Sequence, residues 1–229
     1  MGFFSPPGKR RRWREYACRN EVSLPKAVIL YEKASSGMSE AKILEKMRYL
    51  RELMERQIFS IYEGEENLLE NPFSGYHFRE WENYCRGRKP FSGDCMAIAL
   101  RYAFGVQAQQ RGVCLVPGPM GTGGGFLFSA ISAVARTRGV GEDGVMDALL
   151  TAAGIGLISY SRGNPTGEVM GCMGECGVCA AMASAGIAQM CGGSPEQVEN
   201  AASLALQMSF GWPCDPIPGG IINPVCPGT

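Results

Sequence analysis

Apolar residues recur at intervals of three and four along much of this chain, and this spacing restricts its fold more than any other feature. The clearest run follows Ser39 and precedes Gly64. Its apolar members are Ile43, Met47, Leu50, Met54, Ile58 and Ile61. Such spacing places them on one face of a long helix, which Gly64 would end. Because no strand-like alternation of useful length occurs anywhere, we predict an all-α fold.

Other segments also predict helices. Ser92-Gly93-Asp94 suits a turn that feeds a capped helix over 96–104. A rough helical period covers 145–158, and small residues favour another helix over 174–190. The stretch 65–89 lacks a clear period, so we expect loops and short helices there.

A particularly clear helix start lies at Ser194. Serine suits the N-cap position, Pro195 the first helical position, and Gln197 can complete a capping box. We expect this helix to reach Phe210 and to end at Gly211.

The length and charge of the chain favour one main domain. Its 229 residues suffice for one well-buried core. Lysine plus arginine number 22, as do aspartate plus glutamate, which offers no general electrostatic reason to bind nucleic acid. The positive charge is concentrated in a short run at 9–14. We therefore predict a basic, mobile N-terminal segment (1–22) and one helical domain (23–229).

Three observations predict the cellular compartment of the protein. Met1 to Pro7 is followed by basic residues and not by the apolar core of a signal peptide. The apolar stretch from Val145 to Tyr160 is interrupted by Asp147, which favours a buried helix over a membrane span. Ten cysteines in such a chain favour reduced thiols or metal ligands over disulfides. We expect a cytoplasmic protein without a membrane partner.

The most glycine-rich stretch, Pro117 to Gly125, opens onto a helix that we expect to begin near Phe126. A loop that exposes its backbone at a helix N-terminus favours an anion. Nucleotide binding is disfavoured, because the G-x-G-x-x-G spacing fails at Phe126 and no lysine followed by serine or threonine comes after the last glycine.

Six of the ten cysteines lie between Cys172 and Cys226, and thiolate is the ligand type that iron-sulfur clusters need. One interpretation takes Cys172, Cys176 and Cys179, whose C-x3-C-x2-C spacing is typical of radical S-adenosylmethionine enzymes. Val178 stands where those enzymes usually carry an aromatic residue. The 50 residues that follow Cys179 also lack the parallel strands of the barrel that such enzymes form.

A second interpretation takes Cys172, Cys214 and Cys226 with the segments around them. These segments are Gly171-Cys172-Met-Gly-Glu, Gly192-Gly193-Ser-Pro-Glu-Gln, Pro213-Cys214-Asp-Pro and Pro224-Val225-Cys226, preceded by Ser92-Gly93-Asp94 and by Cys114 with its glycine-rich loop. From about Ser92 to Cys226 the sequence resembles the alpha domain of iron-sulfur L-serine dehydratases.

The resemblance implies a cofactor and an activity. In that family three cysteines bind a 4Fe-4S cluster and leave one iron without a protein ligand; matched motif to motif, they are Cys172, Cys214 and Cys226. Lewis acidity at that iron assists the loss of hydroxide from serine, which yields pyruvate and ammonia. The catalytic base is not identified by the resemblance. We expect the glycine-rich loop to hold the substrate carboxylate through backbone N–H groups; the residues concerned are Gly118, Gly121, Thr122 and Gly123.

Departures from the family pattern leave some questions open. Cys176 and Cys179 replace residues that are usually small or aliphatic, and either could approach the cluster as a fourth ligand. Gly118 stands where the family commonly has a threonine. The replacement removes a hydroxyl group that could contact the substrate, so the resemblance does not establish specificity for serine. The sequence ends three residues after Cys226 and lacks the motif of the family's beta part. We therefore expect a separate beta-type subunit and a hetero-oligomer.

Two other functions remain compatible with these residues. One is a cluster-bearing scaffold or sensor that docks a partner through Arg10 to Arg14 or through the apolar helix over 43–61. The other is a desulfidase, in which the same open iron accepts sulfide as the leaving group.

Overall fold

The computed structural model describes residues 13–60, 77–88, 90–109, 122–165 and 167–209. Within these ranges it contains nine α-helices and no strand, which confirms the predicted all-α fold. The helices are α1 (Trp13–Arg19), α2 (Leu24–Ser36), α3 (Glu40–Ser60), α4 (His77–Gly87), α5 (Gly93–Gln109), α6 (Thr122–Arg138), α7 (Glu142–Arg162), α8 (Gly167–Met190) and α9 (Pro195–Met208).

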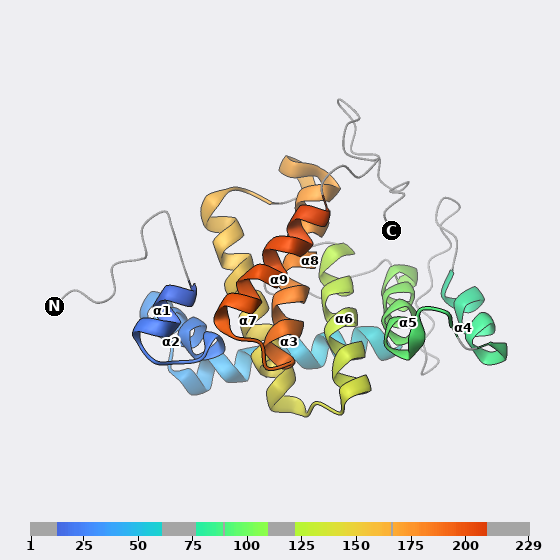
Figure 1. Ribbon diagram of the computed structural model, residues 1–229, viewed down its shortest axis with the longest axis horizontal. Helices are drawn as coiled ribbons and strands as arrows, with labels where there is room; N and C mark the ends of the chain where they lie inside the picture. The colour runs from blue at the N-terminus through green and yellow to red at the C-terminus, as the bar shows by residue number, and fades with distance from the viewer. Residues whose placement is uncertain (1–12, 61–76, 89, 110–121, 166, 210–229) are drawn as a thin grey trace.

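Helices α6 to α9 form a bundle in which successive helices alternate in direction (Figure 1). Consequently α6 and α8 run in the same direction, whereas α7 and α9 run the opposite way. Helix α8 packs against α6, α7 and α9, and so it is the central element of the bundle. It is also the helix that carries the first of the predicted cluster cysteines.

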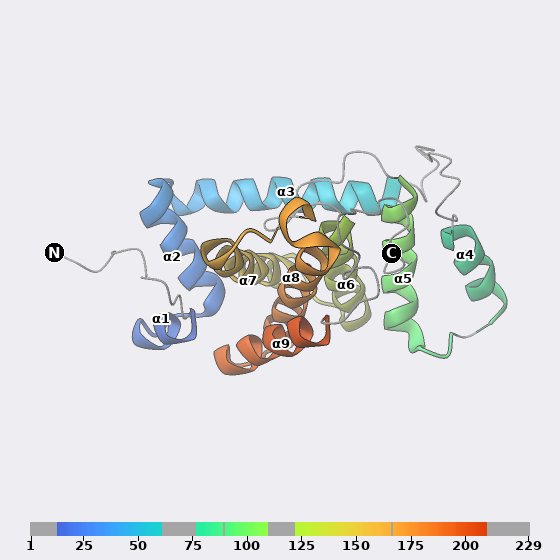
Figure 2. The same cartoon turned by 90° about the horizontal axis from the view of Figure 1, so that it is seen from above.

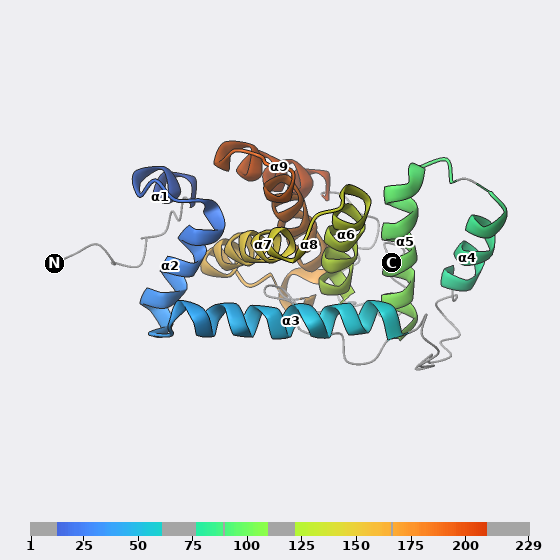
Figure 3. The same cartoon turned by 90° about the horizontal axis from the view of Figure 1, so that it is seen from below.

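Helix α3 lies along one side of the molecule and extends from α2 to α5 (Figures 2 and 3). Its predicted apolar face is buried, since Ile43, Met47, Met54 and Ile58 are each at most 7% exposed. These side chains belong to the main core together with residues of α5, α6, α7 and α8. The face that we considered for partner docking is therefore covered by the chain itself.

Part of the segment that we predicted to be mobile (1–22) is packed against the core. Its residues Trp13–Arg19 form α1, and the Trp13 side chain is 5% exposed. The Trp13 Nε1–H donates a hydrogen bond of 2.8 Å to the carbonyl oxygen of Gly154 on α7, and its ring meets Tyr31 edge-on. The prediction weighed the positive charges of this segment and neglected the large apolar surface of its tryptophan.

Arg14 also serves the fold of this chain. It forms ion pairs with Glu196 at 3.6 Å and Glu199 at 3.7 Å, both on α9. The Arg14 backbone N–H donates a further hydrogen bond to the Glu199 carboxylate. This end of the basic run, which we considered for docking a partner, thus connects α1 to α9.

The predicted helix limits hold in part. The capping box at α9 is confirmed, because the Ser194 side chain accepts from the Gln197 N–H while the Gln197 side chain accepts from the Ser194 N–H. Helix α9 ends at Met208, two residues before the predicted end.

Helix α8 begins at Gly167, seven residues before the predicted start at Gly174. The glycines in the first half of α8 have low helix propensity, which tertiary context overrides here. Cys172 therefore lies inside this helix, and not in a loop that precedes it.

Small residues let α7 and α8 approach closely. A Cβ atom added at Gly186 on α8 would lie 2.7 Å from the carbonyl oxygen of Ala148 on α7. Among the described helices, α7 is long and apolar enough to cross a membrane by length and composition, but half of its apolar window is buried inside the protein. Its apolar residues are accounted for by this place in the core.

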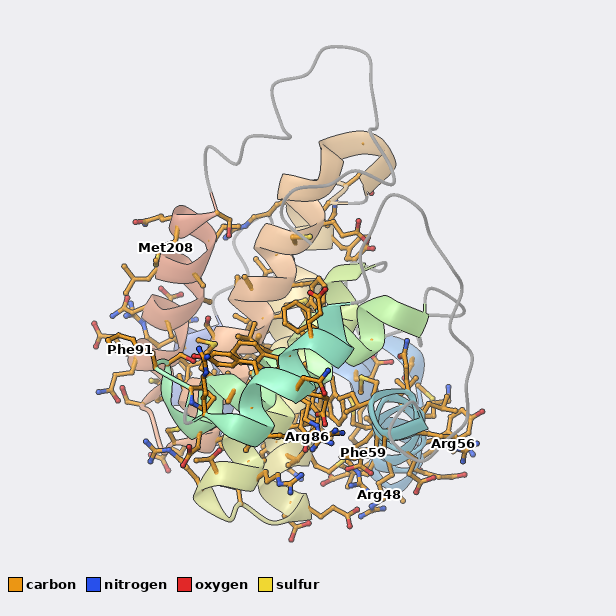
Figure 4. The ribbon with its side chains drawn as sticks, turned by 90° about the vertical axis from the view of Figure 1, so that its right-hand side faces the viewer. Arg48, Arg56, Phe59, Arg86, Phe91 and Met208 are labelled. Carbon is orange, nitrogen blue, oxygen red and sulfur yellow. The ribbon has the colours of Figure 1, made fainter. Side chains whose placement is uncertain are left out.

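Helix α4 forms one end of the molecule and packs on α5 (Figure 4). The Trp81 Nε1–H donates a hydrogen bond of 3.0 Å to the carbonyl oxygen of Ala97, which fastens the two helices together. Phe91, on the connection before α5, is fully exposed (Figure 4).

Candidate functional site

The cysteines of the C-x3-C-x2-C run lie on one continuous helix. Cys172, Cys176 and Cys179 all belong to α8, at positions i, i+4 and i+7. At a rise of about 1.5 Å per residue, Cys172 and Cys179 are separated by roughly 10.5 Å along the helix axis. Neither the loop nor the parallel strands of a radical S-adenosylmethionine enzyme occur among the described residues. The fold therefore contradicts that interpretation of the run.

One stripe of α8 connects the cysteine-bearing end of the helix to the core. Its members follow one another at intervals of three and four: Cys172, Glu175, Cys179, Met182 and Gly186. Met182 is fully buried and Cys179 is 3% exposed. Gly186 lies against Ala148 of α7 and Ile131 of α6. From Cys179 to Gly186 this stripe therefore faces α6 and α7, and Glu175 precedes it at the same helical spacing.

The N-terminus of α6 lies beside the cysteine-bearing half of α8. The two helices run in the same direction (Figure 1), and Ile131 is in contact distance of Gly186. Thr122 precedes Ile131 on α6 by nine residues, and Gly177 precedes Gly186 on α8 by nine residues. Nine residues correspond to about 13.5 Å along either helix. The glycine-rich first turn of α6 is thus at about the level of Gly177.

The C-terminal end of α9 reaches the same level from the other side of α8. A Cβ atom added at Gly177 would lie 3.2 Å from the Ser209 Cβ and 3.5 Å from the nearest Leu206 side-chain carbon. Ser209 is 4% exposed, and its Oγ–H donates to the carbonyl oxygen of Ala205. The chain therefore leaves α9 directly beside α8.

Three predicted motif segments consequently meet at one end of the bundle. The first turn of α6 follows the glycine-rich loop, the first half of α8 carries Cys172, and the end of α9 leads toward the Cys214 segment. Of the predicted site residues, Cys172 lies in α8, while Thr122 and Gly123 lie in the first turn of α6. Gly118, Gly121, Cys214 and Cys226 lie outside the described residues.

The electrostatics of α8 distinguish its cysteines. Burial, together with the smaller effects of the neighbouring Cys176 and Glu175, raises the pKa of the Cys179 thiol to about 12. Because metals bind the thiolate, Cys179 would have to lose its proton before it could act as a cluster ligand. Cys176 is only half-buried.

The cysteines that could bind an iron-sulfur cluster come from segments that are far apart in the sequence. Among the described side chains, no group of three histidine, cysteine or acidic residues could hold a metal ion. The predicted set brings one cysteine of α8 together with two that follow α9. Such a set is composed of thiolates, the usual protein ligands of iron-sulfur clusters.

The sequence was compared with known families and proteins. Residues 19–226 match the model of the family described as "Serine dehydratase alpha chain". The chain belongs to this family. That match covers most of the sequence and confirms the resemblance inferred from the motifs around the cysteines.

Individual members of the serine dehydratase alpha chain family extend the comparison. The chain is 34% identical over 140 residues to an L-serine dehydratase of Streptomyces coelicolor, covering 58% of the chain and 30% of that protein. It is 30% identical over 151 residues to the alpha chain of the Peptoniphilus asaccharolyticus enzyme, covering 66% of the chain and 51% of its relative. It is 26% identical over 210 residues to the "Probable L-serine dehydratase, alpha chain" of Bacillus subtilis, covering 90% and 68%.

The chain thus spans under a third of the Streptomyces relative and about half of the Peptoniphilus one. No solved structure gives a significant match.

Sequence reasoning overlooked one charged residue of this site. Glu175 was part of the family motif that we quoted, but it received no role. The predicted helix over 174–190 already placed it at helical spacing from Cys179 and Met182, whereas its helical relation to Cys172 depends on α8 extending back to Gly167.

Proposed function

We propose that this member of the serine dehydratase alpha chain family is the cluster-bearing subunit of an amino-acid ammonia-lyase that acts on L-serine or a related β-substituted amino acid. The observation that carries the proposal is the convergence of the α6 N-terminus, the cysteine-bearing half of α8 and the end of α9. In the family whose model this chain matches, these three segments carry the motifs that we associate with substrate and cluster.

The proposed cluster ligands are Cys172, Cys214 and Cys226. Cys214 follows Ser209 by five residues, which span at most about 18 Å when fully extended. Since Ser209 lies against Gly177, and Gly177 follows Cys172 by about 7.5 Å of helix, Cys214 is within reach of Cys172. When bound, a cluster with one iron free of protein ligands supplies Lewis-acid assistance to the departure of the β-substituent.

The chain's own residues would hold and orient the substrate. The first turn of α6 has backbone N–H groups without intrahelical acceptors, together with the positive end of the helix dipole. We propose that these groups, in Thr122 and Gly123, bind the substrate carboxylate with Gly118 and Gly121 of the preceding loop. Glycines suit this task because a bare backbone allows close approach of the ligand.

A separate beta-type subunit would complete the site. The Peptoniphilus and Bacillus relatives are themselves named as alpha chains. In this chain, Leu204 and Met208 lie one turn apart near the end of α9 and are 60% and 83% exposed (Figure 4 labels Met208). Exposed apolar side chains beside a site are typical of a surface that a partner covers.

Anaerobic purification with its beta-type partner, followed by electron paramagnetic resonance of the reduced protein, tests the proposal. We expect a 4Fe-4S signal that changes when L-serine is added, together with release of pyruvate and ammonia. Replacing Cys172, Cys214 or Cys226 by serine should remove the signal. Cys191→Ser is the matched control, because Cys191 is exposed in the turn after α8 and should leave the signal intact.

Other outcomes would point to the other functions. A cluster signal indifferent to every β-substituted amino acid, with no enamine or ketoacid product, would replace the lyase with a scaffold or sensor. Sulfide release from L-cysteine in preference to turnover of L-serine would identify a desulfidase.

A further inference from the structure

Glu175 occupies a helix position at which the pattern of α8 leads one to expect an apolar residue. It continues, at the same helical spacing, the stripe formed by Cys179, Met182 and Gly186, which faces α6 and α7. The next two members after Glu175 are buried in the protein. Acidic residues are rarely placed in such a series, because a carboxylate loses hydration there. Departures of this kind occur mainly where function requires them.

The surroundings of Glu175 hold its carboxylate at the edge of the core. The side chain is half-buried, and its negative charge is among the causes that raise the pKa of the buried Cys179 thiol, after burial itself and Cys176. The carboxylate thus lies near Cys179, one helical turn from Cys172. It is the one carboxylate among the described side chains of α8.

We propose that Glu175 binds the α-ammonium group of the amino-acid substrate, an inference that rests on the proposed function. A zwitterionic substrate needs a partner of each sign. The α6 N-terminus supplies positive partial charge for the substrate carboxylate, and Glu175 supplies the negative charge at about the same level of the bundle. The residue thereby selects α-amino acids over β-hydroxy acids that lack the ammonium group.

The isosteric variant Glu175→Gln tests this role in the complex of the full chain with its beta-type subunit. Binding would be followed through the electron paramagnetic resonance of the reduced cluster during titration with L-serine and, separately, with 3-hydroxypropanoate, which lacks the amino group. Iron and acid-labile sulfide would be measured in each preparation to verify the cluster. Glu45→Gln is the matched control, since Glu45 is exposed on α3.

We expect Glu175→Gln to weaken L-serine binding by at least about 10-fold, which corresponds to roughly 1.4 kcal/mol, while leaving 3-hydroxypropanoate binding unchanged. Glu175→Asp, which keeps the charge, should retain part of the preference for L-serine. Glu45→Gln should behave as the unaltered protein.

The results separate this inference from the function on which it rests. If the unaltered protein responds to L-serine and Glu175→Gln responds equally, the role of Glu175 is wrong and the proposed function stands. Equal weakening of both ligands would show a merely structural role for Glu175. If the unaltered protein responds to no β-substituted amino acid, both proposals fail.

Discussion

Raising the pH should destabilise the chain through Cys179, by an amount that follows from the burial of this thiol. Its pKa rises from 9.0 to about 12 in the folded chain. Between these values the unfolded state has released the proton while the folded state retains it, so stability is lost as the pH rises, and below about pH 9 the effect vanishes. At about pH 10 the expected loss is roughly 1.4 kcal/mol. This figure changes little for any folded pKa above about 11, because the unfolded pKa determines it.

The measurement is urea unfolding of the reduced, cluster-free chain at about pH 7.5 and about pH 10, for the unaltered sequence and for Cys179→Ala. Other groups titrate in both proteins and cancel in the comparison, as does the cost of the smaller alanine side chain. The unaltered chain should lose about 1.4 kcal/mol more than the variant between the two pH values. In the folded chain at neutral pH, an alkylating reagent should modify the exposed Cys18 and Cys191 and spare Cys179.

An equal loss of stability in the two proteins would refute the reasoning. Cys179 would then ionise at its ordinary pKa, which requires solvent or a compensating positive charge at its position on α8.

Three further substitutions test the packing that positions the site. Trp13→Phe removes the 2.8 Å hydrogen bond to Gly154 and should lower the protection of α1 amides from hydrogen exchange by about 1–2 kcal/mol. Gly186→Ala would place a Cβ 2.7 Å from the Ala148 carbonyl oxygen and should destabilise the chain by about 1–3 kcal/mol in urea unfolding. Ser194→Ala removes the side-chain acceptor of the α9 capping box and should cost about 1 kcal/mol by the same measurement.

Matched controls identify the cause in each case. Trp81→Phe also removes an indole hydrogen bond, but on α4, so it should leave α1 exchange unchanged. Gly87→Ala adds a Cβ that meets nothing within 4 Å and should be neutral or slightly stabilising. Ser203→Ala removes an exposed hydroxyl within α9 and should have little effect. If Gly186→Ala resembled Gly87→Ala, the close approach of α7 and α8 would be disproved.

Local sequence rules predicted the parts of the fold that depend on neighbouring residues. The spacing over 43–58 predicted the buried face of α3, and the Ser194 to Gln197 pattern predicted the start of α9 with its capping bonds. Ile61 and the predicted helix end at Gly64 lie outside the described residues. The start of α8 was missed because its glycines were weighed by propensity alone, which takes no account of tertiary context. The docking of Trp13 was missed for a similar reason, since its acceptor is a carbonyl group 141 residues away.

The candidate site could be predicted as a set of residues but not as an arrangement. Motifs identified Cys172 and the glycine-rich stretch without showing that the first turn of α6 lies beside the first half of α8. Their proximity depends on the parallel course of α6 and α8, visible in the contact of Ile131 with Gly186. The helical relation of Glu175 to Cys172 depends on α8 extending back to Gly167. Neither relation is encoded in local spacing.

The attachment of α1 has a consequence for the order in which the chain assembles. Its acceptor on α7 lies 141 residues downstream, and its backbone bond to Glu199 on α9 spans 185 residues. Synthesis proceeds from the N-terminus, so α1 leaves the ribosome long before either acceptor exists. Contacts of such separation carry a large loop-closure cost and form late. Helix α1 is therefore among the last of the described helices to dock, and until then Trp13 is an exposed apolar side chain on a nascent chain.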